Sequence, residues 1–223
     1  MRTPLVACGL LFALACSKKD AGPFEGEIVM KTTRAGSAAP TTMTLRAKGE
    51  RLRFDTTAPD GKISHGVFDP AANKVVIIMD AEKAYMDIDF DKPSAQPNTN
   101  PETATLEKTG QKETIAGRTC EVLRVKDATG KRTEVCMTEG LVFFDLSSLK
   151  PGGGGGAKSV AELRQKKSFP LRSVEFDASG KEISRSEVVS INKMALDNAL
   201  FDVPKDYAKI ALPVLPAAPA ATK

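Results

Sequence analysis

Apolar and polar residues alternate along most of the chain with a period of two residues. In residues 24–33, for example, Ile28 and Met30 alternate with Glu27 and Lys31. This alternation predicts a half-buried β-strand, because successive side chains of a strand point to opposite faces of the sheet. Short turns separate further strands of the same kind, at residues 41–48, 51–56, 62–69, 84–90, 106–115, 169–176 and 181–191.

Residues 74–80 break the alternation. Their sequence, KVVIIMD, is apolar at consecutive positions from Val75 to Met79. A strand that is apolar on both sides has to be covered on both faces of its sheet. We therefore expect residues 74–80 to be a strand with side chains packed above and below it.

Residues 113–140 predict two strands joined by a tight turn at residues 127–130. Cys120 and Cys136 are equidistant from Ala128, so a hairpin folded about Ala128 places them opposite each other. Directly opposed residues have Cβ atoms about 4.5–5.5 Å apart, and a small local twist brings them within disulfide range. We expect a Cys120–Cys136 disulfide; two free buried thiols are the alternative.

About ten strands with few helices predict a mainly β (β-rich α+β) domain. We expect a half-open antiparallel β-barrel or strongly curved sheet with one or two covering helices. Residues 157–167 are the best helix candidate, and residues 141–149 are a shorter one. A run of glycines before residue 157 predicts a hinge that would let this helix move: Gly152, Gly153, Gly154, Gly155 and Gly156.

The N-terminus has the pattern of a secretory signal. Residues 1–15 carry one Arg and then an apolar run, too short for a membrane span. Cys16 follows small residues, as in bacterial lipoprotein signals, so we expect Cys16 to be lipidated and residues 16–23 to be a tether. An Asp after the Cys would suggest inner-membrane retention, so Ser17 favours the outer membrane. The alternative is an ordinary secreted protein, and Cys8 is a second local match.

Length and composition limit the number of domains and the classes of function that the rest of the chain can have. Residues 24–212 have the length of one domain, and the Pro/Ala-rich residues 213–223 predict a disordered tail. The net charge of +4, with scattered basic residues and no Trp, does not favour nucleic-acid binding. Two paired cysteines behind a secretion signal predict an oxidising compartment. We expect a monomer.

Several motifs are incomplete. Residues 152–159 resemble a phosphate-binding loop but have Ala157 where that motif needs Gly. Asp87, Asp89 and Asp91 share one strand face without the rest of a calcium loop, so we expect a solvated face. His65, the single His of the chain, has no nucleophile near it in the sequence. The sequence therefore predicts no metal, no cofactor and no catalytic residues.

The chain has a surplus of apolar residues at strand positions that could share one face. These are Ile28, Met30, Leu52, Phe54, Val75, Ile77, Met79, Met86, Ile88 and Phe90. Methionine is an adaptable contact for irregular apolar ligands. We interpret these ten residues as candidates for the lining of an apolar ligand site; a plain hydrophobic core is the alternative.

The segments FEGEIVMKTT, KGERLRFD, ETIAGRTCEV and LFDVPKDY resemble a widespread bacterial family of secreted proteins that is known only as a domain of unknown function. The resemblance covers nearly all of residues 24–207. It implies a fold similar to the LolA/LolB/LppX lipoprotein carriers and the binding of a lipid or acyl chain in the cell envelope, with no catalytic residues to carry over. Because Cys16 predicts an anchor, a LolB-like holder fits better than a shuttle. A protein–protein interaction or structural module with a filled core is the second hypothesis.

Overall fold

A computed structural model describes residues 23–57, 61, 63–69, 74–89, 105–126, 130–142 and 166–211. Several predictions fall outside these residues. They are the signal segment 1–15, the tether with Cys16, the ligand candidate Phe90, the glycine hinge 152–156, nearly all of the helix candidates 141–149 and 157–167, and the tail 213–223.

The described residues form one twelve-stranded sheet and almost no helix. The strands are β1 (Glu25–Arg34), β2 (Thr41–Lys48), β3 (Arg51–Thr57), β4 (Ile63–Asp69), β5 (Lys74–Met79), β6 (Ala84–Asp89), β7 (Thr105–Ile115), β8 (Arg118–Lys126), β9 (Arg132–Thr138), β10 (Phe169–Phe176), β11 (Glu182–Lys193) and β12 (Ala208–Lys209). The 3₁₀-helix η3 (Asn198–Phe201) precedes β12, with Asp197 as its N-cap.

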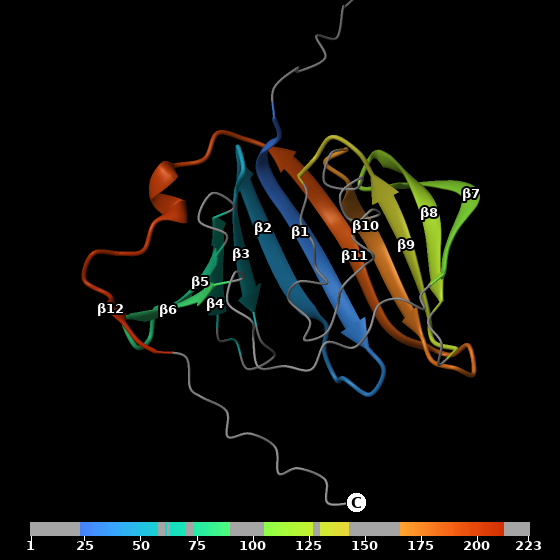
Figure 1. The fold of residues 1–223 in the computed structure, drawn as a ribbon, viewed down its shortest axis with the longest axis horizontal. Coiled ribbons are helices and arrows are strands. Elements are labelled where there is room, and N and C mark those ends of the chain that lie inside the picture. The colour runs from blue at the N-terminus through green and yellow to red at the C-terminus, as the bar shows by residue number, and fades with distance from the viewer. Residues whose placement is uncertain are drawn as a thin grey trace, which may run out of the picture.

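The sheet consists of two antiparallel meanders. Strands β6 to β1 lie in reverse sequence order, and β1 then pairs with β11, which begins the second series β11-β10-β9-β8-β7 (Figure 1). The short strand β12 adds to the outer edge of β6 and is parallel to it. The sheet is therefore open, with β12 and β7 as its two edges, and the predicted curved antiparallel sheet is confirmed.

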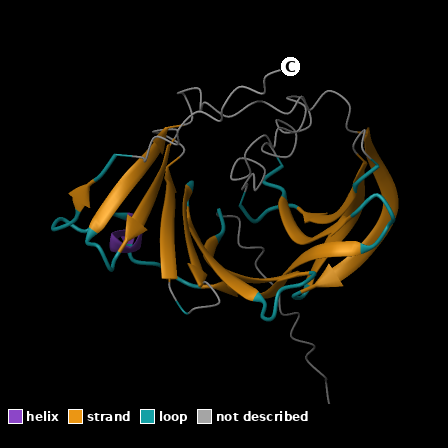
Figure 2. Cartoon of the chain, turned by 90° about the horizontal axis from the view of Figure 1, so that it is seen from below, coloured by secondary structure: helices purple, strands orange, loops and turns teal. Residues whose placement is uncertain are grey.

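The two halves of the sheet differ in regularity. The ladders among β1 to β6 pair without a register shift, whereas register shifts interrupt the ladders of β7, β10 and β11. One shift follows Pro170, which cannot donate a ladder hydrogen bond. Because a bulge bends its strand and increases the local twist, the β7–β11 half curls strongly in Figure 2.

Two apolar clusters lie on opposite faces of the sheet. The larger one lies on the concave side, which we call the inner face, and contains side chains of both halves, such as Ile28, Leu45, Val122 and Leu171. The smaller one lies on the outer face, where Val67, Val76 and Ile78 pack against Leu196 and Phe201.

Residues 194–211, which we call the C-terminal strap, cover the outer face at β3 to β6; the strap contains η3 and β12 (Figure 1). The apolar strand β5 contributes Val75 to the inner cluster and both Val76 and Ile78 to the outer one. The prediction that residues 74–80 are covered on both faces is therefore confirmed.

The stapled hairpin has a register that differs from the prediction. The disulfide joins Cys120 and Cys136, whose Cα atoms are 5.3 Å apart. Cys136, however, pairs with Val122 rather than with Cys120, because the β8–β9 ladder is centred on residue 129 and not on Ala128. The two cysteines are thus diagonal neighbours, and the expected direct opposition is wrong.

Gly66 of β4 makes room for an aromatic ring. Gly66 pairs with Phe54 on the inner face, and a Cβ atom at Gly66 would lie 1.9 Å from Cζ of Phe54. The ring therefore lies over the backbone of β4, where any side chain would displace it.

We expect Gly66→Ala to reduce the free energy of unfolding by roughly 1–3 kcal/mol, the usual effect of overpacking a core. Urea unfolding measures this change. The double variant Phe54→Leu/Gly66→Ala should recover part of the loss, because the smaller side chain leaves space for the new methyl group. Ser64→Ala, on the same strand and face, is the control and should change stability little. Equal losses in the single and double variants would contradict this account.

Candidate functional site

The register of the sheet places nine of the ten candidate residues on one face; Phe90 lies outside the described residues. Ile28 pairs with Leu45, Leu45 with Phe54, and Phe54 with Gly66. The same row continues through Ile77 to Met86. Residues at even spacing along each strand share the face of this row, and they include Met30, Leu52, Val75, Met79 and Ile88.

On β1, the inner-face residues from Gly26 to Thr32 are all uncharged. The same holds for the described inner-face residues of β2 to β6 that continue these rows across the sheet. These inner-face residues are Gly26, Ile28, Met30, Thr32, Thr41, Met43, Leu45, Ala47, Leu52, Phe54, Thr56, Ser64, Gly66, Phe68, Val75, Ile77, Met79, Ala84, Met86 and Ile88. Charged residues of the same strands alternate with them on the outer face, as in Arg51, Arg53 and Asp55 of β3. The alternation of the sequence therefore keeps charged side chains off these inner-face positions, whereas the outer face carries charged side chains as well as the apolar Val67, Val76 and Ile78.

Burial divides the inner face into two zones. Ile28, Leu45, Leu52 and Val75 are fully buried at 0–1% exposure and form a packed floor. Toward the β6 edge, Phe68, Ile77, Met79, Met86 and Ile88 are half-buried. Because these last side chains are apolar yet partly accessible, they are the part of the inner face that could contact a ligand.

Sequence reasoning missed several inner-face residues. Met43 and Leu45 of β2 and Phe68 of β4 belong to the same cluster as the predicted set. The signal was present in β2, because Met43, Leu45 and Ala47 alternate with Thr44 and Arg46.

The outer face carries a chain of ion pairs instead. Glu27 Oε2 lies 2.9 Å from the Arg46 guanidinium, which also contacts Asp55. Asp55 Oδ1 accepts from Arg53 Nε at 2.7 Å and lies 2.6 Å from His65 Nδ1. Burial raises the pKa of Asp55, but hydrogen bonds from Arg53 and His65 outweigh it, so this pKa is lowered.

His65 connects this chain of ion pairs to the C-terminal strap. Its Nε2 lies 2.7 Å from Asp80 Oδ2, and Asp80 Oδ1 accepts a hydrogen bond from the Tyr207 hydroxyl at 2.8 Å. The hydrogen bond to Asp80 raises the pKa of Tyr207. His65 is therefore enclosed by two carboxylates and Arg53, and its side chain is only 13% exposed.

Cations of β2 and β3 hold the strap through its backbone carbonyls. Lys48 Nζ donates to Leu196 O at 2.5 Å, and Arg53 donates to Leu200 O at 2.9 Å. Arg51 donates to Phe201 O and lies over the Phe201 ring, 5.3 Å from its centroid. The cations of the outer face therefore hold the C-terminal strap in place.

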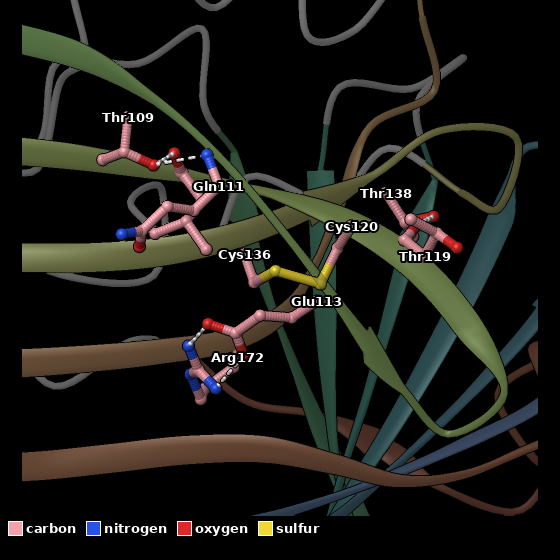
Figure 3. Close-up of a disulfide and its surroundings, with 9 residues drawn as sticks. Thr109, Gln111, Glu113, Thr119, Cys120, Cys136, Thr138 and Arg172 are labelled. Carbon is pink, nitrogen blue, oxygen red and sulfur yellow. Dashed lines mark hydrogen bonds and ion pairs between the residues drawn. A yellow bond between two sulfur atoms is a disulfide. The ribbon is translucent and has the colours of Figure 1, made fainter.

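A second polar group lies beside the disulfide. Arg172 donates two hydrogen bonds to the carboxylate of Glu113, at 2.5 and 2.6 Å (Figure 3). This bidentate pairing lowers the pKa of Glu113 and raises that of Arg172. The pair ties β7 to β10 across the stapled hairpin, a structural role.

The described residues also bound a cavity of about 410 Å³ at the ends of β7, β8 and β9, beside the β10–β11 turn. Its cations are engaged by neighbours. Arg124 pairs with Glu107 and Glu134, and Arg132 lies over the Phe176 ring, 4.2 Å from its centroid.

Within the described ranges, no group of His, Cys, Asp and Glu side chains could hold a metal ion, and no helix is long and apolar enough to cross a membrane.

The fold and this face define a class: an open, curved antiparallel sheet with an uncharged apolar inner face and a charged outer face. A sequence model of the family described as "Domain of unknown function (DUF4412)" matches residues 24–207, so the chain belongs to this family. The predicted membership of an uncharacterised β-rich family is thereby confirmed. A search of curated protein sequences finds no match for the chain.

Solved structures provide further comparisons. The chain is similar to an uncharacterised conserved protein from Thermus thermophilus, with 13% identity, 84% of this chain and 91% of that chain covered, and a TM-score of 0.51. MucB in the Pseudomonas aeruginosa MucA/MucB complex is 14% identical, with 86% and 62% covered and a TM-score of 0.47. A Vibrio parahaemolyticus domain named for outer membrane lipoprotein sorting is 10% identical, with 82% and 91% covered and a TM-score of 0.28. Of these three, only the Thermus structure has a TM-score above 0.5. At 13% sequence identity, this similarity shows a shared fold and nothing more specific.

We expect Asp55→Asn to lower the free energy of unfolding by about 1–3 kcal/mol at pH 7, since the half-buried Arg46, Arg53 and His65 lose their shared charged acceptor. A carboxylate whose pKa is lowered in the folded state stabilises the fold above its unfolded pKa of about 3.9. This contribution is lost as the pH falls through the lowered folded pKa. Urea unfolding from pH 7 to pH 2.5 should therefore show the difference from wild type constant above about pH 5 and shrinking in acid.

The matched control is Asp202→Asn, because Asp202 is 62% exposed and pairs with Arg51 at the surface. Such a pair contributes about 0–1 kcal/mol. A difference between wild type and Asp55→Asn that is equally large at pH 2.5 and pH 7 would contradict the assignment.

Proposed function

We propose that this chain is a cell-envelope lipoprotein, anchored through Cys16 and facing the periplasm. In this proposal its inner face binds an apolar ligand, a lipid or an acyl chain, as a holder or receptor in the manner of LolB rather than as an enzyme. The observation that carries the proposal is the uncharged inner face of β1 to β6, whose half-buried edge is made of Phe68, Ile77, Met79, Met86 and Ile88.

The ligand class follows from the energetics of such a face. Each methylene group removed from water contributes about 0.8 kcal/mol, whereas a charged group brought onto a face without counter-ions loses its hydration without compensation. An alkyl chain therefore gains affinity along its whole length, and ionic groups are disfavoured. Met79 and Met86 are flexible and polarizable, so they can adapt to chains of different shape.

The interaction-module hypothesis is less well supported by the sheet edges. An exposed edge strand can pair with a partner, but β7 is interrupted by the register shift between Lys108 and Lys112. Thr109 Oγ1 stabilises this bulge, donating to Val122 O at 2.7 Å and accepting from Gln111 N at 3.2 Å. Bulges and lysines are the devices that protect edges against pairing, so the holder is the function we propose.

Ligand binding is tested with the uncharged apolar fluorophore N-phenyl-1-naphthylamine and solvent-extracted protein. We expect Ile77→Gln and Ile88→Gln each to weaken its binding about tenfold, because each places an amide in the apolar zone. Met86→Gln is a milder variant in case either isoleucine variant folds poorly, which circular dichroism would show. Ile63→Gln is the control, since Ile63 lies on the outer face and is 54% exposed. No binding by wild type, or equal affinities in all variants, would refute the holder function.

Anchoring is tested by metabolic labelling with a palmitate analogue in a Gram-negative host. We expect Cys16→Ser to lose the label and to leave the membrane fraction, because the acyl chains are attached at Cys16. Cys8→Ser is the matched control and should keep both. Loss of the label in Cys8→Ser, or its retention in Cys16→Ser, would exclude Cys16 as the anchor.

A further inference from the structure

The inner face changes from apolar to hydroxyl-bearing along the direction of its strands. Two rows of paired residues contain apolar residues and Gly66: one runs from Ala47 to Ile88, and the next from Ile28 to Met86. In the third row Met30 pairs with Met43, but Met43 pairs with Thr56, and Thr56 with Ser64.

The fourth row consists of hydroxyl groups. Thr32 pairs with Thr41 on β2 and with Ser186 on β11. Thr32 Oγ1 and Ser186 Oγ form a hydrogen bond of 2.7 Å. Thr32, Thr41, Thr56 and Ser186 are half-buried and Ser64 is exposed, so this end of the face, which we call the hydroxyl end, is accessible to a polar group.

The dimensions of the apolar zone fit one acyl chain. At about 3.4 Å per residue, the stretch of β5 from Val75 to Met79, which includes the half-buried Ile77 and Met79, is about 14 Å long. The hydrocarbon core of a bilayer is about 30 Å thick, so one leaflet is about 15 Å. An acyl chain that lies along the strands therefore spans the apolar rows and reaches the hydroxyl end.

We propose that the ligand is an amphiphile with an uncharged, hydrogen-bonding head group, such as a hydroxyl, ester or amide, bound with this head at the hydroxyl end. The proposal rests on the proposed function and adds the class and the orientation of the ligand. Hydroxyl side chains both donate and accept, so they satisfy an uncharged head without a counter-ion. On β1, the nearest cation at an inner-face position is Arg34, the exposed last residue of the strand, which lies beyond the Thr32 row; Lys31 points to the outer face.

The test compares three molecules of similar chain length as displacers of N-phenyl-1-naphthylamine from the full chain: 1-monooleoylglycerol, oleate at pH 8 and octadecene. We expect 1-monooleoylglycerol to bind about tenfold more tightly than octadecene and more tightly than oleate, because a few hydrogen bonds suffice for such a difference. The double variant Thr32→Val/Thr56→Val should lose this preference and keep its affinity for the fluorophore. Thr33→Val, on the outer face of β1, is the control and should change neither.

Three outcomes would overturn the proposal. Equal affinity for 1-monooleoylglycerol and octadecene would remove the head-group site while leaving the holder function intact. Tightest binding of oleate, lost in Arg34→Gln, would assign an anionic head instead. No binding of the fluorophore by wild type would refute the holder function and this inference together.

Discussion

The pairing of β1 with β11 is the contact on which the rest of the sheet depends. It joins two meanders that are otherwise separate, and its partners are far apart in sequence, as in Gly26 and Lys193. The two chains approach so closely that a Cβ atom at Gly26 would lie 2.1 Å from Asn192 O. Without this pair, each meander would have one more open edge, and the inner cluster, which takes side chains from both, would lose one of its walls.

Charge has different roles on the two faces of this sheet. On the outer face, Arg46, Asp55 and His65 form one connected network, and Lys48, Arg51 and Arg53 hold the carbonyls of the C-terminal strap. The strap in turn covers Val76 and Ile78, which is why β5 can be apolar on both sides. The alternation along the strands places these charged side chains on the outer face. The inner face of β1 to β6 therefore carries no charge from Gly26 to Thr32 or at the described positions paired with them, and this absence of charge is the physical basis of the function we propose.

The inner face combines a rigid part with an adaptable part. The fully buried side chains of β1, β2 and β3 form a packed floor, and methionines and isoleucines of β5 and β6 remain partly accessible. A binding face of this kind recognises its ligand by burial along the chain and by a few hydrogen bonds at one end, rather than by ion pairs. The disulfide and the Glu113–Arg172 pair stabilise the opposite, strongly curled half.

The sequence by itself determined the strands, the alternation that separates the faces, the cysteine pair and the membership of the family. These properties are local, because a period of two assigns each side chain to a face whatever its neighbours are. The tertiary structure decided what depends on distant partners. The strand β12 is two residues long and exists because the strap brings it to β6, and Cys136 pairs with Val122 because the ladder, not the symmetry of the hairpin, sets the register. Which apolar residues form the floor and which stay half-buried was likewise set by the pairing of β1 with β11 and by the curl of the bulged strands, since burial depends on which parts of the chain meet in space.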